Sequence, residues 1–293
     1  MKFLLILSLA LFSCSKSDII DPLPTPPAAD SIYLSKFFTI DTTLAAPADT
    51  IGETRFAYDA QKRLKTLTMF RINAATGTRD SAYIFTYTYN GNDSLPAHIY
   101  ERQDFRINYK FSFEHFLIYN ASRRLSSDSS RFIQTQPFAS TSVYSNKYIY
   151  NSTGFTDSTY NYLPSVSTAK EDVQQTRDAQ GNVTRDYVDN VNRISYDVTY
   201  DGHVNPLYRV SPVKEPYFSN ATYPTFLEGK TPQKSNFTRI VTSQYNTAGT
   251  IIGTVTINYA YTYKSNGLPL FTRQATTPAA VSDKFKYYFV YTN

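Results

Sequence analysis

The feature that most constrains the fold is a repeat with a period of about 30 residues. Each clear copy has a large apolar side chain, any residue, a Tyr, and then Asp or Asn. The Tyr residues of the four clearest copies lie 31, 30 and 31 residues apart, at Tyr58, Tyr89, Tyr119 and Tyr150. Degenerate copies follow at 176–181, 199–202, 244–249 and 262–267. A fixed period of this length indicates a chain built from repeated supersecondary units.

One unit predicts a strand followed by a tight turn. Large side chains two residues apart lie on one face of a strand, and Tyr and Phe favour a half-buried pleated surface. The Asp or Asn that follows bonds its own backbone and starts a turn, after which the chain returns. Two strands per period predict an all-β fold, an antiparallel meander of β-hairpin repeats that forms a long curved sheet or an open shell or roll. Residues 166–178 are expected to be a strand, and 284–291 an edge or closing strand.

The last strands carry aromatic side chains at alternate positions. These are Tyr259, Tyr261 and Tyr263 in one column and Tyr287, Phe289 and Tyr291 in the other. We expect the two columns to face each other across neighbouring strands. The opposite face carries Thr, Ser and Lys, so one face of the sheet should pack while the other contacts water.

The segment Phe56–Leu64, with its Tyr, Asp and later Arg and Leu, resembles the YD repeat of large secreted shell proteins. It is more closely similar to Bacteroidota lipoproteins that carry YD-like domains of no assigned activity. The likeness covers about residues 52–291 and implies a β fold. This chain departs from the repeat where Arg177 replaces Tyr and where no Gly follows Tyr58 and Tyr119, which leaves the turn types there open.

The N-terminal sequence MKFLLILSLALFSC is typical of a bacterial lipoprotein signal. Its apolar run, Phe3 to Phe12, is ten residues long, whereas a membrane-spanning helix needs roughly 20. We therefore expect residues 1–13 to be a cleaved signal peptide. Cys14 is the single cysteine of the chain and is expected to be the acylated, palmitate-bearing first residue of the mature protein.

The residues after Cys14 bear on where the anchored protein lies. Ser15 stands where an Asp retains lipoproteins in the inner membrane of Gram-negative bacteria, so the resemblance implies the outer membrane. The segment 16–21 matches only in part the acidic run of surface-exposed Bacteroidota lipoproteins, which leaves the periplasmic face and the cell surface open. Prolines stiffen residues 14–30 into a tether, and residues 31–293 are expected to form a single repetitive all-β domain.

Residues 205–236 break the repeat, because their five prolines exclude a central strand. We expect a long irregular excursion. Its aromatic side chains include Tyr208, Tyr217, Phe218, Tyr223 and Phe226. These form either a platform that binds a sugar or a peptide, or a strap that packs on the sheet. A Tyr217→Ala/Phe218→Ala variant should lose binding in the first case and thermal stability in the second.

The sequence shows no catalytic or metal-binding constellation. His98, His115 and His203 lack metal-ligand spacing, and no nucleophile-elbow motif occurs. The six Glu residues, at 53, 101, 114, 171, 215 and 228, leave open a carboxylate pair that meets across strands. No such pair stands out, so we expect no enzyme activity, no cofactor and no metal. The formal charge of +5 comes from dispersed Lys and Arg side chains, which does not favour nucleic-acid binding.

Several Asp-Ser and Asp-Thr pairs resemble the acceptor that Bacteroidota use for periplasmic O-glycosylation. The candidate acceptors are Thr42, Thr50, Ser81 and Ser94. Ordinary turn chemistry accounts for the same pairs, and the intact mass of the native protein after delipidation distinguishes the two.

Two function classes follow from the sequence. The first is an outer-membrane-anchored, non-catalytic binding module for an envelope glycan or protein, which uses the water-facing sheet or the 205–236 excursion. The alternative is a structural or assembly lipoprotein that pairs with a partner through its sheet edges.

Overall fold

The structure, a computed structural model, describes residues 32–46, 48–73, 75–104, 110–136, 138–152, 154–161, 167–189, 193–211, 213, 233–279 and 281–292. The predicted signal peptide and the whole tether, with Cys14, lie outside the described residues. The strands are β1 (Tyr33–Asp41), β2 (Thr50–Tyr58), β3 (Leu64–Ile72), β4 (Arg79–Tyr89), β5 (Pro96–Asp104), β6 (Lys110–Tyr119), β7 (Leu125–Gln136), β8 (Ser140–Tyr150), β9 (Gly154–Asn161), β10 (Ser167–Arg177), β11 (Val183–Asp189), β12 (Ile194–Val204), β13 (Ser235–Tyr245), β14 (Ile251–Tyr263), β15 (Pro269–Thr277) and β16 (Phe285–Thr292).

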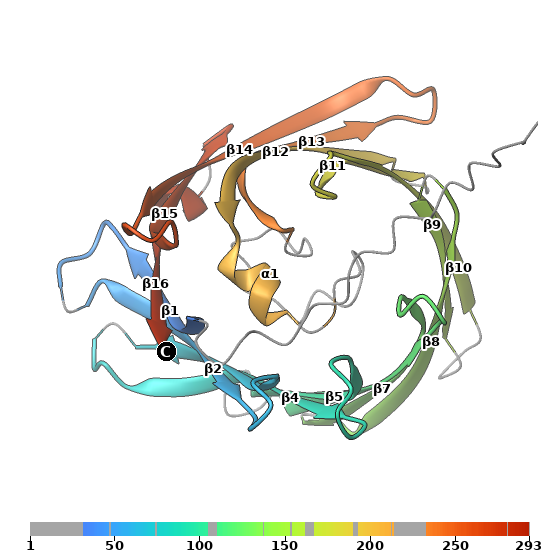
Figure 1. The fold of residues 1–293 in the computed structure, drawn as a ribbon, viewed down its shortest axis with the longest axis horizontal. Helices are drawn as coiled ribbons and strands as arrows, with labels where there is room; N and C mark the ends of the chain where they lie inside the picture. Colours follow the sequence, from blue (N-terminus) through green and yellow to red (C-terminus); the bar gives the residue numbers. More distant parts are fainter. Residues whose placement is uncertain are drawn as a thin grey trace, which may run out of the picture.

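The sixteen strands form one antiparallel meander that closes into a barrel. Each strand pairs with its neighbours in sequence, and β16 returns to pair with β1 from Tyr33↔Thr292 to Asp41↔Phe285. Figure 1 shows the colours running once around the ring until red β16 meets blue β1. The predicted meander is confirmed, and the predicted curved sheet is closed by its final strand. Closure pairs the edge strands that an open roll would leave exposed.

The repeat maps onto the strands as predicted. Tyr58, Tyr89, Tyr119 and Tyr150 are the last residues of β2, β4, β6 and β8, so that each period holds two strands and two turns. The segment around 166–178, predicted to be a strand, forms β10. The predicted pairing of the two aromatic columns is wrong, because β15 lies between β14 and β16. Thr272 of β15 pairs with Tyr261 on one side and with Tyr287 on the other.

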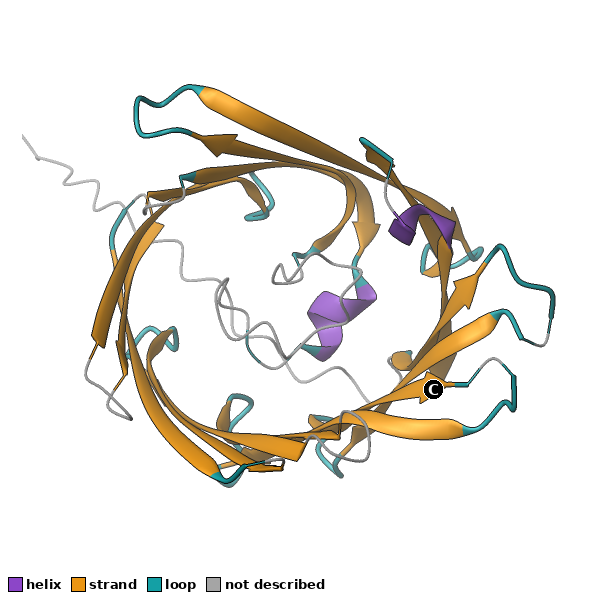
Figure 2. Ribbon diagram, turned by 180° about the vertical axis from the view of Figure 1, so that it is seen from behind, coloured by secondary structure: helices purple, strands orange, loops and turns teal. Residues whose placement is uncertain are grey.

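The packed face of the sheet is the inner wall of the barrel. Alternate residues of most strands, among them Phe37, Phe85 and Ile240, are buried in one apolar cluster. The same cluster includes Leu207 and Val210 of α1 (Pro206–Val210). Both views place α1 within the ring outline (Figures 1 and 2). The inner wall therefore carries the apolar core, and buried polar side chains such as Glu101, Asp128 and Gln274 lie on the same face.

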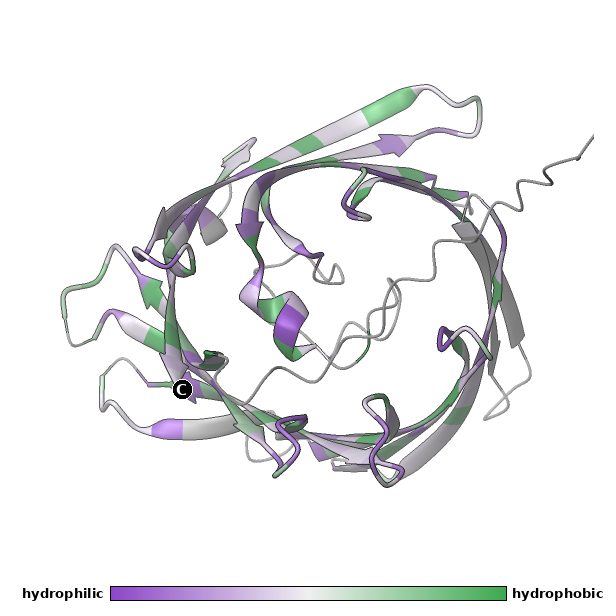
Figure 3. Ribbon diagram, in the orientation of Figure 1, coloured by the Kyte–Doolittle hydropathy of each residue, from purple (hydrophilic) through white to green (hydrophobic). Residues whose placement is uncertain are grey.

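The opposite face of each strand points outward and is largely polar. In β14 the outward positions are Thr254, Thr256, Asn258, Ala260 and Thr262, which alternate with inward Ile257, Tyr259 and Tyr261. Figure 3 shows hydrophilic and hydrophobic residues interspersed along the strands. This confirms the expectation that one face of the sheet packs; contact of the other face with water stays a prediction.

The described helical segments are short. In α1, the Asn205 side chain caps the first turn by accepting from the Leu207 N–H; a 3-10 turn, η2 (Val281–Lys284), precedes β16. None of the helices in the described ranges is long and apolar enough to cross a membrane. The predicted 205–236 excursion thus begins with α1 and ends at the start of β13. Residues 212 and 214–232 of it lie outside the described part of the chain.

Candidate functional site

The Tyr of each repeat builds one rim of the barrel. Each of these Tyr residues lies near the end of a strand. Its hydroxyl donates to a backbone carbonyl at the start of the preceding strand, on that strand's first or second residue. The bonds run from Tyr58 to Leu34, Tyr89 to Leu64, Tyr119 to Pro96, Tyr150 to Leu125, Tyr200 to Val183 and Tyr291 to Pro269. Burial raises the pKa of Tyr58 and Tyr89 well above the ordinary range for Tyr. These hydroxyls are thus engaged and neutral, which makes them structural.

The residue after the Tyr builds a shared turn. The side-chain Oδ1 of Asp59 accepts from the Arg63 N–H, four residues later, while the Asp59 N–H donates to the Arg63 carbonyl. The same pair of bonds recurs between Asn120 and Arg124. The fourth residue of each such turn has positive φ. It is Lys62 (64°), Arg123 (60°), Gly181 (85°), Gly249 (79°) or Gly267 (77°). Lys62 and Arg123 therefore adopt the left-handed conformation that Gly supplies elsewhere, which settles the two turns left open by the sequence.

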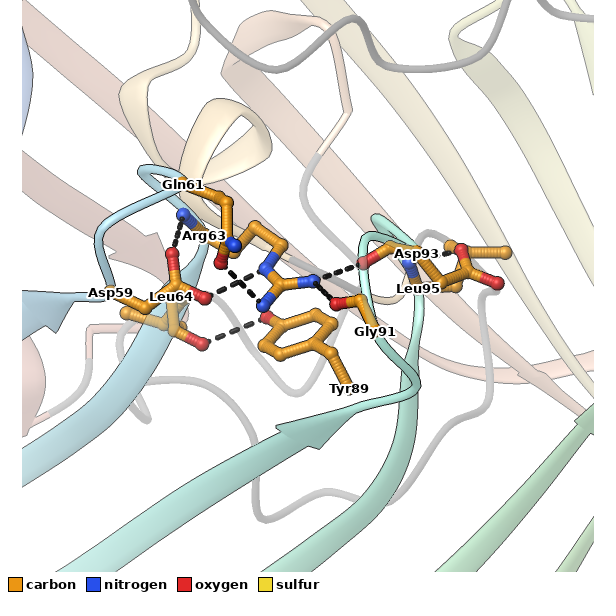
Figure 4. A network of polar contacts seen from close by, with 8 residues as sticks. All are labelled: Asp59, Gln61, Arg63, Leu64, Tyr89, Gly91, Asp93 and Leu95. Carbon is orange, nitrogen blue, oxygen red and sulfur yellow. Dashed lines mark hydrogen bonds and ion pairs between the residues drawn. The ribbon is translucent and has the colours of Figure 1, made fainter.

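Arg63 ties one turn to the next (Figure 4). Its Nε donates to Asp59 Oδ2 at 2.7 Å, and its Nη1 donates to the carbonyls of Gly91 and Asp93 at 2.7 Å each. Its guanidinium lies 4.3 Å from the centre of the Tyr89 ring. Arg124 lies over Tyr150 in the same way, at 3.5 Å. The repeated Tyr hydroxyls and the Asp or Asn side chains that follow them are thus used in building the rim.

A polar cluster on the inner wall has no such structural explanation. His115 on β6 and Asp128 and Ser130 on β7 are 2–5% exposed, on the face that carries the apolar core. His115 Nδ1 lies 2.9 Å from Ser130 Oγ and 3.3 Å from Asp128 Oδ2, and Ser130 Oγ donates to Asp128 Oδ2 at 2.8 Å. Asp128 Oδ1 is buried and has no hydrogen-bond partner within the described part of the chain.

The residue types of this cluster match a nucleophilic triad, but its geometry does not. A serine nucleophile needs one imidazole nitrogen as its base while the other nitrogen holds the acid. Here the same Nδ1 faces both Ser130 and Asp128, and Ser130 also donates to the carboxylate. The arrangement fixes three polar groups on the wall and does not activate the serine.

Glu101 extends the polar cluster on the neighbouring strand β5. It is 0% exposed; its Oε1 accepts from Gln103 Nε2, while its Oε2 has no hydrogen-bond partner among the described residues. Burial raises the pKa of Glu101, against the opposing effects of Gln103 and His115. A buried carboxyl oxygen left without a donor is costly and marks a place where a ligand donor fits.

Aromatic rings lie beside these carboxyl groups. Phe113 on β6 pairs directly with Glu101, and Phe111 with Gln103. The Phe113 ring lies 4.9 Å from that of Phe132 and 5.8 Å from that of Phe111. All three residues are only partly buried, so part of this aromatic surface is accessible. We define the inner-wall site as Glu101, Gln103, Phe111, Phe113, His115, Asp128, Ser130 and Phe132.

Of the aromatic residues predicted to bind a ligand, the structure describes one. Tyr208 lies half-buried in α1, and Tyr217, Phe218, Tyr223 and Phe226 fall outside the described residues. Sequence reasoning missed the inner-wall site, since its His and Asp are 13 residues apart and meet only through the pairing of β6 with β7. The one available signal was polar residues at alternate positions, Asp128 and Ser130, within an otherwise core-facing strand.

The predicted glycosylation acceptors lie at strand ends and in turns. Thr42 is exposed, yet its Oγ1 donates to the Lys284 carbonyl at 2.7 Å. Thr50 begins β2, and Ser94 Oγ accepts from Arg123 Nη2 at 3.1 Å. Ser81 lies within β4. These contacts are ordinary turn and strand contacts, and modification stays a prediction.

The other sequence candidates are separate from the inner-wall site. The His98 ring packs on the outward Phe116 at 4.8 Å, and His203 stacks on Tyr263 at 3.9 Å. Within the described ranges, no three His, Cys, Asp or Glu side chains gather as a metal site would require. A pocket of about 430 Å³ on β10 and β11 is lined by Gln174, Gln175, Thr176, Arg185 and Tyr187. It lacks the buried carboxyl groups of the inner wall.

Comparisons with known proteins show similarity of fold only. No family model and no curated protein matches this sequence. A porin-like protein from Bacteroides uniformis is similar in structure, with a TM-score of 0.50 and 11% identity over 88% of this chain and 96% of that one. A porin-like protein from Bacteroides vulgatus has a TM-score of 0.52 and 12% identity over 89% and 99% of the two chains.

Proposed function

We propose that this chain is a lipid-anchored, non-catalytic binding protein of the bacterial envelope, and that its barrel holds a glycan. The observation that carries the proposal is the inner-wall site, where accessible aromatic rings adjoin buried carboxyl groups. Sugar rings present C–H faces that pack on aromatic rings, and their hydroxyls donate to carboxyl and amide oxygens. Glu101 Oε2 and Asp128 Oδ1 are buried acceptors for which the described residues supply no donor. A polyhydroxylated ligand would supply the missing donors.

The polarity of the wall supports an interior site. The outer wall presents charged side chains such as Arg131 and Lys147 to its surroundings, while the aromatic side chains of the buried core line the inside. An exterior of this kind suits water. The sequence around Cys14 supports attachment to the membrane through a lipid on that residue. The Bacteroides origin of the similar porin-like structures is consistent with an outer-membrane-associated setting.

The alternative function, assembly through sheet edges, has less support. Strand addition needs a strand with an unpaired side. Each strand from β1 to β16 has a hydrogen-bonded neighbour on both sides, because β16 pairs with β1. The interior therefore offers a binding surface where the edges do not.

A glycan array probed with the full chain tests the proposal, followed by a matched pair of variants on β6. Phe113→Ala removes an inner-wall ring, whereas Phe116→Ala removes an outward ring that is 50% exposed. We expect Phe113→Ala to weaken glycan binding at least tenfold, in line with a contact of 1–2 kcal/mol from one aromatic ring. Phe116→Ala should bind as the parent does. Equal binding by all three proteins, or no glycan bound at all, contradicts an interior glycan site.

The anchor is tested separately in the native host. Membrane fractionation of the parent and of a Cys14→Ala variant should place the parent with the membrane and release the variant. A variant that stays with the membrane to the same extent contradicts lipid attachment at Cys14.

A further inference from the structure

An outward stripe of side chains crosses five strands near the closure of the barrel, with an aromatic residue on four of them. Phe271 on β15 pairs with Tyr288 on β16, and Tyr288 pairs with Phe38 on β1. Phe38 pairs with Glu53 on β2, which pairs with Phe70 on β3. Their neighbours Phe37 and Phe289 belong to the inner core, so these residues point outward. We call Phe38, Phe70, Phe271 and Tyr288 the outer stripe, and each is only partly buried.

Five cationic side chains flank the outer stripe; they are Lys36, Arg55, Arg79, Arg273 and Lys286. Lys286 Nζ lies 3.5 Å from the centre of the Phe271 ring and 4.6 Å from that of Tyr288. The Arg55 guanidinium lies 4.7 Å from the centre of the Phe70 ring. Arg273 is exposed directly opposite Lys286. Cations and aromatic rings thus share one face of the wall.

Glu53 lies within the outer stripe and neutralises only part of this charge. Its carboxylate contacts Arg79 Nε at 2.6 Å, Arg55 Nε at 2.7 Å and Lys36 Nζ at 3.9 Å. The side chain of Glu53 is 1% exposed, whereas those of the three cations are 44–50% exposed. The carboxylate is therefore covered and the positive charges face the surroundings.

We propose that the outer stripe docks on the anionic lipid headgroups of the membrane that holds the anchor, a step that rests on the proposed attachment at Cys14. Aromatic rings favour the headgroup level of a bilayer, and each Lys or Arg near an anionic leaflet adds to binding. The face lies on the convex exterior of the barrel, which fits an extended surface better than a single chain. The tether from Cys14 leads directly into β1, the strand that carries Lys36 and Phe38.

Vesicle binding of an acyl-free protein tests the stripe without the anchor. The full chain with Cys14→Ala is mixed with vesicles of phosphatidylglycerol and phosphatidylcholine, or of phosphatidylcholine alone, and sedimented. We expect binding to the anionic vesicles only, and release as ionic strength rises. The signal sequence is common to every variant, so differences among variants report on the barrel wall.

The decisive comparison is between two triple variants. Each removes three positive charges, one variant at the outer stripe and the other on the opposite side of the barrel. Lys36→Gln/Arg273→Gln/Lys286→Gln acts on the outer stripe and leaves the Arg55 and Arg79 contacts of Glu53 in place. Arg131→Gln/Lys147→Gln/Arg185→Gln removes three exposed cations of β7, β8 and β11, across the ring. The first variant should bind anionic vesicles at least tenfold more weakly than the parent and the second within twofold, since each cation near the leaflet contributes substantially.

Three results overturn the proposal: equal losses in both variants, no preference for anionic vesicles, or binding of a soluble acidic polysaccharide in place of vesicles. The vesicle assay uses the Cys14→Ala protein, which carries no acyl chain, so its outcome does not depend on lipid attachment at Cys14. Lipid attachment is tested separately by the membrane fractionation. Glycan binding at the inner-wall site should be the same in both variants.

Discussion

At the scale of single residues, the repeated Tyr joins neighbouring strands at one rim. Tyr89 illustrates the arrangement: its hydroxyl donates to the Leu64 carbonyl at 2.8 Å, and its ring lies under the Arg63 guanidinium. The hydroxyl is buried, so without this bond the Leu64 carbonyl would lose a donor that water would not readily replace. Both the hydroxyl and the ring of this Tyr therefore contribute contacts at the rim.

We expect Tyr89→Phe to lower the free energy of unfolding by about 1 kcal/mol, because it deletes one buried hydrogen bond and keeps the ring. The control is Tyr100→Phe on β5, whose side chain faces outward; its effect should stay within about 0.5 kcal/mol. Urea unfolding of the parent and both variants gives the comparison. A Tyr89→Phe protein as stable as the control contradicts a role for the hydroxyl.

The sequence predicted the rim residues but only part of their geometry. The Tyr and the following Asp or Asn were recognised from their spacing, and the structure confirms a strand end and a turn at each clear copy. The positive φ of Lys62 and Arg123 was not predictable from residue type. The turn bonds made by Asp59 and Asn120 determine the backbone there and override the preference of a side chain for negative φ.

At the scale of elements, an ion pair connects the end of β1 to the turn before β16. Lys284 Nζ lies 2.6 Å from Asp41 Oδ2, and Asp41 also accepts from the Thr43 N–H and hydroxyl. The hydrogen bond from Lys284, followed by that from the Thr43 side chain, lowers the pKa of Asp41 to about 2. This contact secures the strand pair that closes the barrel.

The lowered pKa of Asp41 predicts a loss of stability in acid. The ionised form is favoured in the folded state, so its stabilising effect is fully present above the unfolded-state pKa of 3.8 and is lost as the pH falls toward about 2. Asp41→Asn should be less stable than the parent at pH 6 and approach it at pH 2. Thermal unfolding across this range measures the difference, and a constant gap between the two proteins contradicts the assignment.

Strands were easier to predict from sequence than their arrangement. Alternating aromatic residues identify a strand locally, and β14 and β16 follow that pattern, whereas β10 contains no aromatic residue. Which strands are neighbours depends on the whole chain. The columns of Tyr259 and Tyr287 were expected to meet, but the return strand β15 has small polar residues on that face and separates them. The inner-wall site was missed for the same reason, because pairing of β6 with β7 brings His115 to Ser130.

At the scale of the whole molecule, closure makes every strand depend on the others. Removal of residues 281–293 deletes β16 and leaves β1 and β15 each with one unpaired side. Exposed edges template pairing with other chains. We expect this truncated protein to form oligomers in size-exclusion chromatography, whereas a Val290→Ala variant, altered at an outward position 38% exposed, should elute as the parent does. A monomeric truncated protein that unfolds like the parent contradicts this dependence.

The first and last strands of the barrel are neighbours, so the two ends of the described chain lie side by side. Tyr33 and Thr292 are paired neighbours, so a short covalent link between them, combined with a cut at any rim turn, would preserve every ladder of hydrogen bonds. The starting point of the chain is set by what precedes β1, the segment that leads to Cys14. Under the proposed attachment at Cys14, the position of the tether sets which strand comes first, and a permuted chain would be anchored at another strand of the same ring.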